Sequence, residues 1–174
     1  LTNLASGLHF TEGPAADASG NLFFSDVRAD TIYKWSVSNE LSVVRTNSGG
    51  ANGLFFDALG NLVVCEGVNG RIVSLSPAGT VTPLATSFGG LRFNEPNDLW
   101  IDPLGGVYFS DPVYFGQTET QGGEFVYYLR PDRSAVLRVV GDTVRPNGLV
   151  GTSDGKTLYV ADWGTTNVWR YAIN

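Results

Sequence analysis

The sequence predicts an all-β protein in which one unit of β-structure is repeated four times. The units open 40, 45 and 50 residues apart, at Glu12-Gly13-Pro14, Asn52-Gly53-Leu54, Asn97-Asp98-Leu99 and Asn147-Gly148-Leu149. A turn glycine follows each opening residue after eight positions, at Gly20, Gly60, Gly105 and Gly155. A repeat of this length is typical of a β-propeller blade.

Each unit reads as short strands joined by tight turns. The chain holds 22 glycines, is 12% aromatic and only 16% charged, a composition that favours strands over helices. Second strands are predicted at 22–25, 62–65, 107–110 and 158–161, third strands at 31–35, 71–75 and 167–171, and outer strands at 41–45, 81–85 and 135–140. Units of four strands repeated radially form a propeller.

We therefore expect residues 1–174 to form a single propeller domain with blades at about 11–50, 51–95, 96–143 and 144–174. The fourth unit reaches Asn174 before an outer strand, and residues 1–10 are expected to be a lone outer strand of the closing blade. Either this strand completes a four-bladed ring, or further blades are missing and the units form an open arc.

Polar residues recur at both ends of the predicted inner hairpin. Because the second strand returns to the end where the first strand begins, the opening residues and the closing acids must share one rim. The closing acids are Asp26, Glu66, Asp111 and Asp162. We expect a functional site at this rim of the central channel.

Composition restricts the partners and the compartment. The net charge of −6 disfavours nucleic acid and anionic membranes, and no apolar run is long enough to span a bilayer. Cys65 is the only cysteine, so no internal disulfide is possible. The sequence contains no methionine, even at position 1, which predicts a processed or partial chain. Loss of a leader favours an extracytoplasmic origin over a cytoplasmic one.

Several short motifs occur in a fixed order along the chain: Glu12-Gly13-Pro14, Ala51-Asn52-Gly53-Leu54, Cys65-Glu66-Gly67, Asn94-Glu95-Pro96-Asn97-Asp98-Leu99, Val107-Tyr108-Phe109-Ser110-Asp111-Pro112, Arg145-Pro146-Asn147-Gly148-Leu149 and Leu158-Tyr159-Val160-Ala161-Asp162. Together they resemble the gluconolactonase/regucalcin (senescence marker protein) family, and most closely its bacterial gluconolactonase-like members. The resemblance implies a six-bladed propeller, of which this chain is a part.

The resemblance also implies one divalent cation, usually calcium, in the channel. By the family's motifs its ligands fall on Glu12, Asn97 and Asn147. A fourth ligand, an aspartate that is also the expected general base, would lie beyond Asn174. Within residues 1–174 the catalytic residue is therefore unknown.

The residue types point independently to a hard cation. Carboxylate and amide oxygens suit calcium, with manganese or magnesium as alternatives. Zinc would require histidine or thiolate ligands, and His9 and Cys65 lie in unrelated places. A Ser-His-Asp hydrolase is excluded because the nucleophile motif is absent and His9 is the only histidine.

Five further residues are candidates for substrate binding: Asn52, Glu66, Arg92, Glu95 and Asp111. Each also has a structural explanation, because asparagine and acids commonly cap turns and the other two suit a solvated loop. Tyr114, Phe115 and Trp163 are placed to stack on a sugar ring. The loop after Asp111 is longer than its counterparts, which is typical of either a lid or a surface insertion.

Three functions remain in competition. The first is a metal-dependent lactonase of the gluconolactonase type, which opens a sugar lactone to a hydroxy acid by cation polarisation of the carbonyl and activated water. The second is a non-catalytic propeller that binds a ligand or partner, since fold alone does not give function. The third is a propeller enzyme similar to strictosidine synthase, against which the Glu-Gly-Pro and Pro-Asn-Gly motifs argue.

Overall fold

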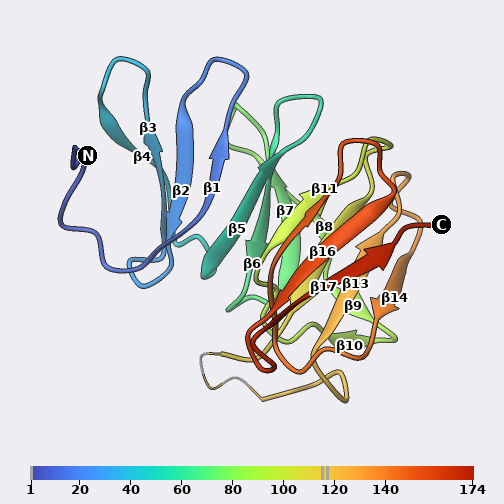
Figure 1. Ribbon diagram of the computed structural model, residues 1–174. Coiled ribbons are helices and arrows are strands. Elements are labelled where there is room, and N and C mark those ends of the chain that lie inside the picture. The colour runs from blue at the N-terminus through green and yellow to red at the C-terminus, as the bar shows by residue number, and fades with distance from the viewer. Residues whose placement is uncertain (1, 115, 117) are drawn as a thin grey trace.

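The computed structural model describes residues 2–114, 116 and 118–174, which form 17 strands and no helix (Figure 1). Four sheets follow one another along the chain, each an antiparallel meander. They stand side by side in an arc, with the first sheet at one end and the fourth at the other (Figure 1). No helix in the described part of the chain could cross a membrane.

The strands fall where the repeat predicts them. The first sheet contains β1 (Thr11–Ala16), β2 (Leu22–Asp26), β3 (Thr31–Trp35) and β4 (Leu41–Thr46), and the second contains β5 (Ala51–Phe56), β6 (Leu62–Glu66), β7 (Arg71–Leu75) and β8 (Val81–Ala85). The third contains β11 (Leu99–Ile101), β12 (Val107–Asp111), β13 (Phe125–Leu129) and β14 (Val136–Val140), and the fourth contains β15 (Pro146–Gly151), β16 (Thr157–Asp162) and β17 (Asn167–Ala172). The predicted all-β propeller architecture is confirmed.

Two segments lie outside these sheets. A small hairpin, β9 (Ser87–Phe88) with β10 (Leu91–Arg92), connects the second sheet to the third and was not predicted from the sequence. Residues 2–10 form no strand in the described structure and lead along the end of the arc into β1 (Figure 1). Their role as the outer strand of a closing blade stays a prediction.

Three hydrophobic clusters fill the spaces between neighbouring sheets. Ile32, Leu54 and Val64 pack between the first and second sheets, Phe93, Phe109 and Tyr127 between the second and third, and Trp100, Leu149 and Val160 between the third and fourth. The hydrophobic effect of burying these side chains is the main contribution that holds neighbouring blades together. Cys65 is completely buried in the middle cluster, as its place in an apolar strand predicts.

Hydrogen bonds join neighbouring blades at the opening residues. The buried hydroxyl of Ser25 donates to the Asn52 carbonyl at 2.8 Å, and that of Ser110 donates to the Asn147 carbonyl at 2.7 Å. The Gly53 amide donates to the Asn97 carbonyl at 2.7 Å. Gly13 is required at its position because a Cβ would lie 2.1 Å from the Asn52 carbonyl oxygen. These bonds fix the backbone of the opening residues.

Replacing Ser110 by alanine should lower the free energy of unfolding. The change removes the donor to the Asn147 carbonyl and the acceptor of the Asp98 amide, both inside the packed arc. We expect a loss of about 1–3 kcal/mol, which urea denaturation would measure. Ser38→Ala, at an exposed turn, is the matched control. An unchanged stability of Ser110→Ala would show that the bond between blades contributes nothing.

Candidate functional site

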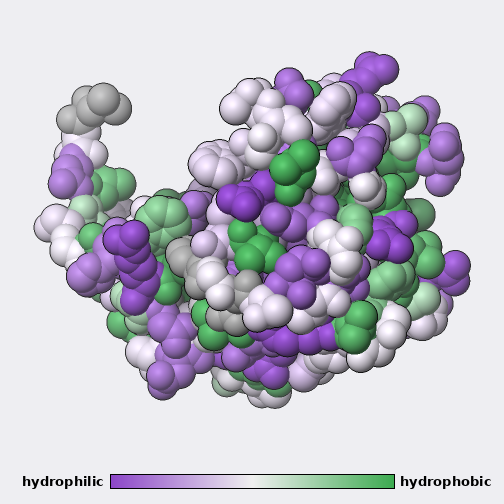
Figure 2. Space-filling model, turned by 90° about the horizontal axis from the view of Figure 1, so that it is seen from below, coloured by the Kyte–Doolittle hydropathy of each residue, from purple (hydrophilic) through white to green (hydrophobic). Residues whose placement is uncertain are grey.

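The four opening residues line one groove between the inner strands of the four sheets. The groove has a volume of about 320 Å³, and Glu12, Asn52, Asn97 and Asn147 all contribute to its wall. They come from β1, β5, the segment before β11, and β15, so every blade supplies one. Figure 2 views the molecule from the side of this rim, where hydrophilic residues cover much of the surface. The repeat thus produces a convergent polar site.

The side chains of this set are free to bind a ligand. Asn52 and Asn97 are 6% and 7% exposed, and neither they nor Glu12 make a side-chain hydrogen bond within the described residues. The Asn147 Nδ2 donates to the Tyr114 hydroxyl at 2.9 Å, which leaves its Oδ1 available. The amide atoms of Asn52 and Asn97 are not among the buried polar atoms that lack a partner, so they stay in contact with solvent and open to a ligand in the groove.

This donor set fits a hard divalent cation. One carboxylate and three amide carbonyls are oxygen ligands of the kind that calcium and magnesium prefer, and no histidine or cysteine lines the groove. Across residues 2–114, 116 and 118–174, no cluster of three or more histidine, cysteine, aspartate or glutamate side chains could hold a metal. A cation site here would therefore depend on asparagine. The assignment of Glu12, Asn97 and Asn147 as ligands stays a prediction.

Asp98 also lines the groove and was not predicted as a site residue from the sequence. Its Oδ2 accepts a hydrogen bond from the Leu149 amide at 3.0 Å, so it links the third blade to the fourth. Burial raises the pKa of Asp98 to about 6, and the nearby Glu12 adds to the rise. Its place beside Asn97 was visible in the sequence, but its reach into the next blade was not.

The closing acids share the rim but turn their oxygens to the backbone. Asp26 accepts from the amides of His9 and Phe10, and Asp162 accepts from those of Val144 and Arg145. Each therefore holds the chain where it enters its own blade. This is the capping role that acids at strand ends commonly have.

Glu66 departs from that pattern. Its carboxylate is completely buried and pairs with two arginines, Arg45 at 2.8 Å and Arg71 at 2.5 Å, and it also accepts from Asn69. A glutamate is one methylene longer than an aspartate, so it reaches past the backbone to these side chains. Glu66 does not line the groove, and its predicted contact with substrate stays a prediction.

Asp111 is completely buried at the end of β12. Its Oδ2 accepts from the Asn94 amide at 2.9 Å, while its Oδ1 has no hydrogen-bond partner within the described residues. Burial raises the pKa of Asp111 to about 8, although the bond from Asn94 and the positive charge of Arg92 oppose the rise. It lies behind the rim and not in the groove, so its substrate role is likewise untested.

Arg92 and Glu95 are held in place by the loops around them. The guanidinium of Arg92 donates to the carbonyls of Phe93 at 2.7 Å and Asn94 at 2.6 Å, and Glu95 is 4% exposed and accepts from the Tyr114 amide. Glu95 also lines a small hollow on the rim together with Asn52, Asn97 and Tyr114. Of the five predicted substrate residues, the structure brings Asn52 and Glu95 next to Asn97.

Aromatic side chains gather beside Asn147. The rings of Tyr114 and Trp163 meet edge to face with centroids 6.2 Å apart, and the Arg145 guanidinium lies 5.5 Å from the first ring and 5.4 Å from the second. Trp163 is 64% exposed, so its face is open to solvent. Phe115, the third predicted aromatic, lies outside the described residues. Arg145 belongs to one of the sequence motifs, but its contact with these rings was not predicted.

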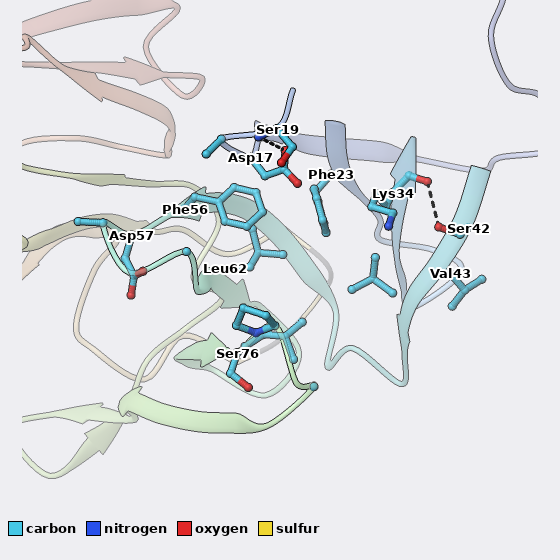
Figure 3. Close-up of a pocket in the computed structure, with 17 residues that line it drawn as sticks. Asp17, Ser19, Phe23, Lys34, Ser42, Val43, Phe56, Asp57, Leu62 and Ser76 are labelled. Carbon is cyan, nitrogen blue, oxygen red and sulfur yellow. Dashed lines mark hydrogen bonds between the residues drawn. The ribbon is translucent and has the colours of Figure 1, made fainter. Parts of the chain in front are cut away.

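A larger hollow of about 570 Å³ lies on the opposite face, between the first two sheets (Figure 3). Its polar residues include Asp17 and Asp57, which accept hydrogen bonds from their own turns at Ser19 and Leu59. Phe23, Phe56 and Leu62 form much of its apolar wall (Figure 3). Because its acids are engaged locally, this hollow has no set of convergent free groups.

The fold and the groove define a β-propeller with an oxygen-rich central site. Comparison with known proteins identifies the group to which it belongs. Residues 10–174 match the model of the SMP-30/gluconolactonase/LRE-like region, so the chain is a member of this family. The resemblance inferred from the motifs is confirmed.

Individual proteins similar to this chain belong to the same group. The chain is 31% identical to the gluconolactonase of Zymomonas mobilis over 98% of its own length and 54% of that protein. The structure of a gluconolactonase from Xanthomonas campestris superposes with a TM-score of 0.92 at 29% identity, covering 98% of this chain and 61% of that one. A regucalcin from Agrobacterium tumefaciens shares the fold with a TM-score of 0.78 at 19% identity, covering 98% and 57%. The chain thus spans little more than half the length of these relatives.

The buried carboxyl of Asp111 should make stability depend on pH. Because burial raises its pKa from 3.8 to about 8, the folded chain holds a proton there that the unfolded chain releases. The free energy of unfolding should therefore fall between about pH 4 and pH 8 by roughly a few kcal/mol, and level off above. Asp111→Asn should remove this fall, so the difference in stability between variant and parent should grow with pH.

Urea denaturation at a series of pH values would measure this difference. The exposed Asp132→Asn is the control, and it should differ from the parent by a constant amount over the same range. A constant difference for Asp111→Asn as well would show that Asp111 is ionised in the folded chain.

Proposed function

We propose that the protein carrying these residues is a calcium-dependent lactonase of the gluconolactonase type, which hydrolyses a sugar lactone to a hydroxy acid. The observation that carries the proposal is the set of polar side chains that bring oxygen atoms to one groove: Glu12, Asn97 and Asn147, from three different blades. Asn52 completes the wall of the groove. Magnesium and manganese are the alternative cations, because they accept the same oxygen ligands.

The relatives support this proposal. Among them are the gluconolactonase of Zymomonas mobilis and a lactonase, drp35, of Staphylococcus saprophyticus at 24% identity over 91% of this chain and 50% of that protein. The regucalcin of Agrobacterium tumefaciens is a calcium-binding protein. Since this chain spans about half of each, the activity is proposed for the whole protein and not for residues 1–174 by themselves.

The residues of this chain would bind the cation and orient the lactone. Glu12, Asn97 and Asn147 would hold the cation through their carboxylate and amide oxygens. Once bound, the cation supplies a Lewis acid that polarises a lactone carbonyl and lowers the pKa of water. Asn52 and Glu95, next to Asn97, are the nearest groups for the hydroxyls of a sugar ring. Arg92, Glu66 and Asp111 do not line the groove and would act indirectly, by holding the surrounding loops and strands in place.

The reaction adds water across the ring ester. The water oxygen forms a bond to the carbonyl carbon, the ring carbon–oxygen bond breaks, and the released alkoxide takes up a proton, which gives the hydroxy acid. A base must accept the proton from water. By the family resemblance this base is an aspartate beyond Asn174, so residues 1–174 would contribute cation binding and substrate orientation.

Asn147→Ala should weaken calcium binding at least about tenfold, which corresponds to roughly 1.4 kcal/mol, because it removes one of the proposed oxygen ligands. Isothermal titration with Ca²⁺, Mg²⁺ and Mn²⁺ would measure the affinities, and acid release from gluconolactone would measure turnover in the full-length protein. Asn3→Ala, at an exposed asparagine that does not line the groove, is the matched control. Unchanged affinity and turnover in Asn147→Ala would sink the proposal.

A further inference from the structure

Tyr114 follows Asp111, the last residue of β12, by three positions, and its side chain reaches Asn147 in the wall of the groove. Tyr114 belongs to the third blade, while Asn147 opens the fourth. The Asn147 Nδ2 lies 2.9 Å from the Tyr114 hydroxyl oxygen and donates to it. This is the one hydrogen bond that any of the four opening side chains makes within the described residues.

The bond holds the asparagine amide by one end. An amide has a donor end and an acceptor end, and only the carbonyl oxygen can bind a cation. With Nδ2 engaged by Tyr114, Oδ1 lies on the other side of the planar group and remains free. An unrestrained asparagine would also present its NH₂ end to the groove, and ordering it on binding would cost entropy.

Tyr114 is itself fixed from three sides. Its amide donates to the Glu95 carboxylate, which is buried two residues before Asn97. Its ring faces the Arg145 guanidinium at 5.5 Å and meets the Trp163 ring at 6.2 Å. A cation over an aromatic ring is an attractive contact. The tyrosine thus joins the side chain of Glu95, two residues before one proposed ligand, to the side chain of another.

Arg145 and Asn147, at the start of the fourth blade, both reach Tyr114. The guanidinium of Arg145 faces its ring, and the amide of Asn147 donates to its hydroxyl.

We propose that Tyr114 is a positioning residue, which orients the Asn147 amide so that its Oδ1 faces a cation in the groove. This inference rests on the proposed function, because it assigns a role toward the same cation. Through Tyr114, the third blade contacts Asn147, the proposed cation ligand that the fourth blade supplies.

The test compares calcium affinities by isothermal titration of the full-length protein. Tyr114→Phe removes the hydroxyl and keeps the ring with its Arg145 and Trp163 contacts, so the affinity should fall roughly five- to tenfold. Tyr159→Phe, an exposed tyrosine of β16 that does not line the groove, is the control and should leave it unchanged. Urea denaturation of both variants checks that each is folded.

A second background separates orientation from general damage to the rim. In Asn147→Asp both side-chain oxygens can bind a cation, so orientation matters less, and adding Tyr114→Phe should cost clearly less than it does beside asparagine. An equal cost in both backgrounds would overturn the positioning role, as would a parent-like affinity of Tyr114→Phe. If the parent protein binds no cation, the proposed function itself fails. If it binds and only Tyr114→Phe is silent, the proposed function stands and the inference falls.

Discussion

The close contact between the opening strands of successive blades is the constraint on which the site depends. Ser25 donates to the Asn52 carbonyl, Gly53 to the Asn97 carbonyl and Ser110 to the Asn147 carbonyl, so these three opening backbones are tied to a neighbouring blade. With their carbonyls committed, the side chains project into the groove. Glycine follows at 13 and 53 because a Cβ there would collide with the next strand. The contacts that pack the blades together therefore also place the side chains of the site.

The repeat makes much of this predictable from sequence. Strand positions, turn glycines and the convergence of Glu12, Asn52, Asn97 and Asn147 follow from one register, because a hairpin returns its end to its start. Contacts between side chains of different blades do not follow from it. Tyr114 meets Asn147 across 33 residues, and Asp98 reaches Leu149 across 51. Such pairs depend on how blades are rotated against each other, which no local pattern encodes.

The closing acids show how far equivalent positions diverge. Asp26 and Asp111 both cap the entry to their own blade, yet their pKa values move in opposite directions. Burial opposes ionisation of both, but amides of His9, Phe10 and Ala29 together outweigh it at Asp26, whose pKa is lowered. Asp111 lies deeper and has an oxygen without a partner within the described residues, so burial dominates. The repeat sets the residue type, while the burial and hydrogen-bond partners of each copy set its pKa.

The distribution of charge points to the groove for the same reason. Arginines are plentiful on the rim, but each described contact turns them elsewhere: Arg45 and Arg71 pair with Glu66, Arg92 with loop carbonyls, and Arg145 with aromatic rings and Glu124. Glu12 has no ion pair within the described residues and lies near Asp98, in a chain of net charge −6. Neither Glu12 nor Asp98 has an ion pair within the described residues, and this local excess of negative charge supports the cation proposed for the groove.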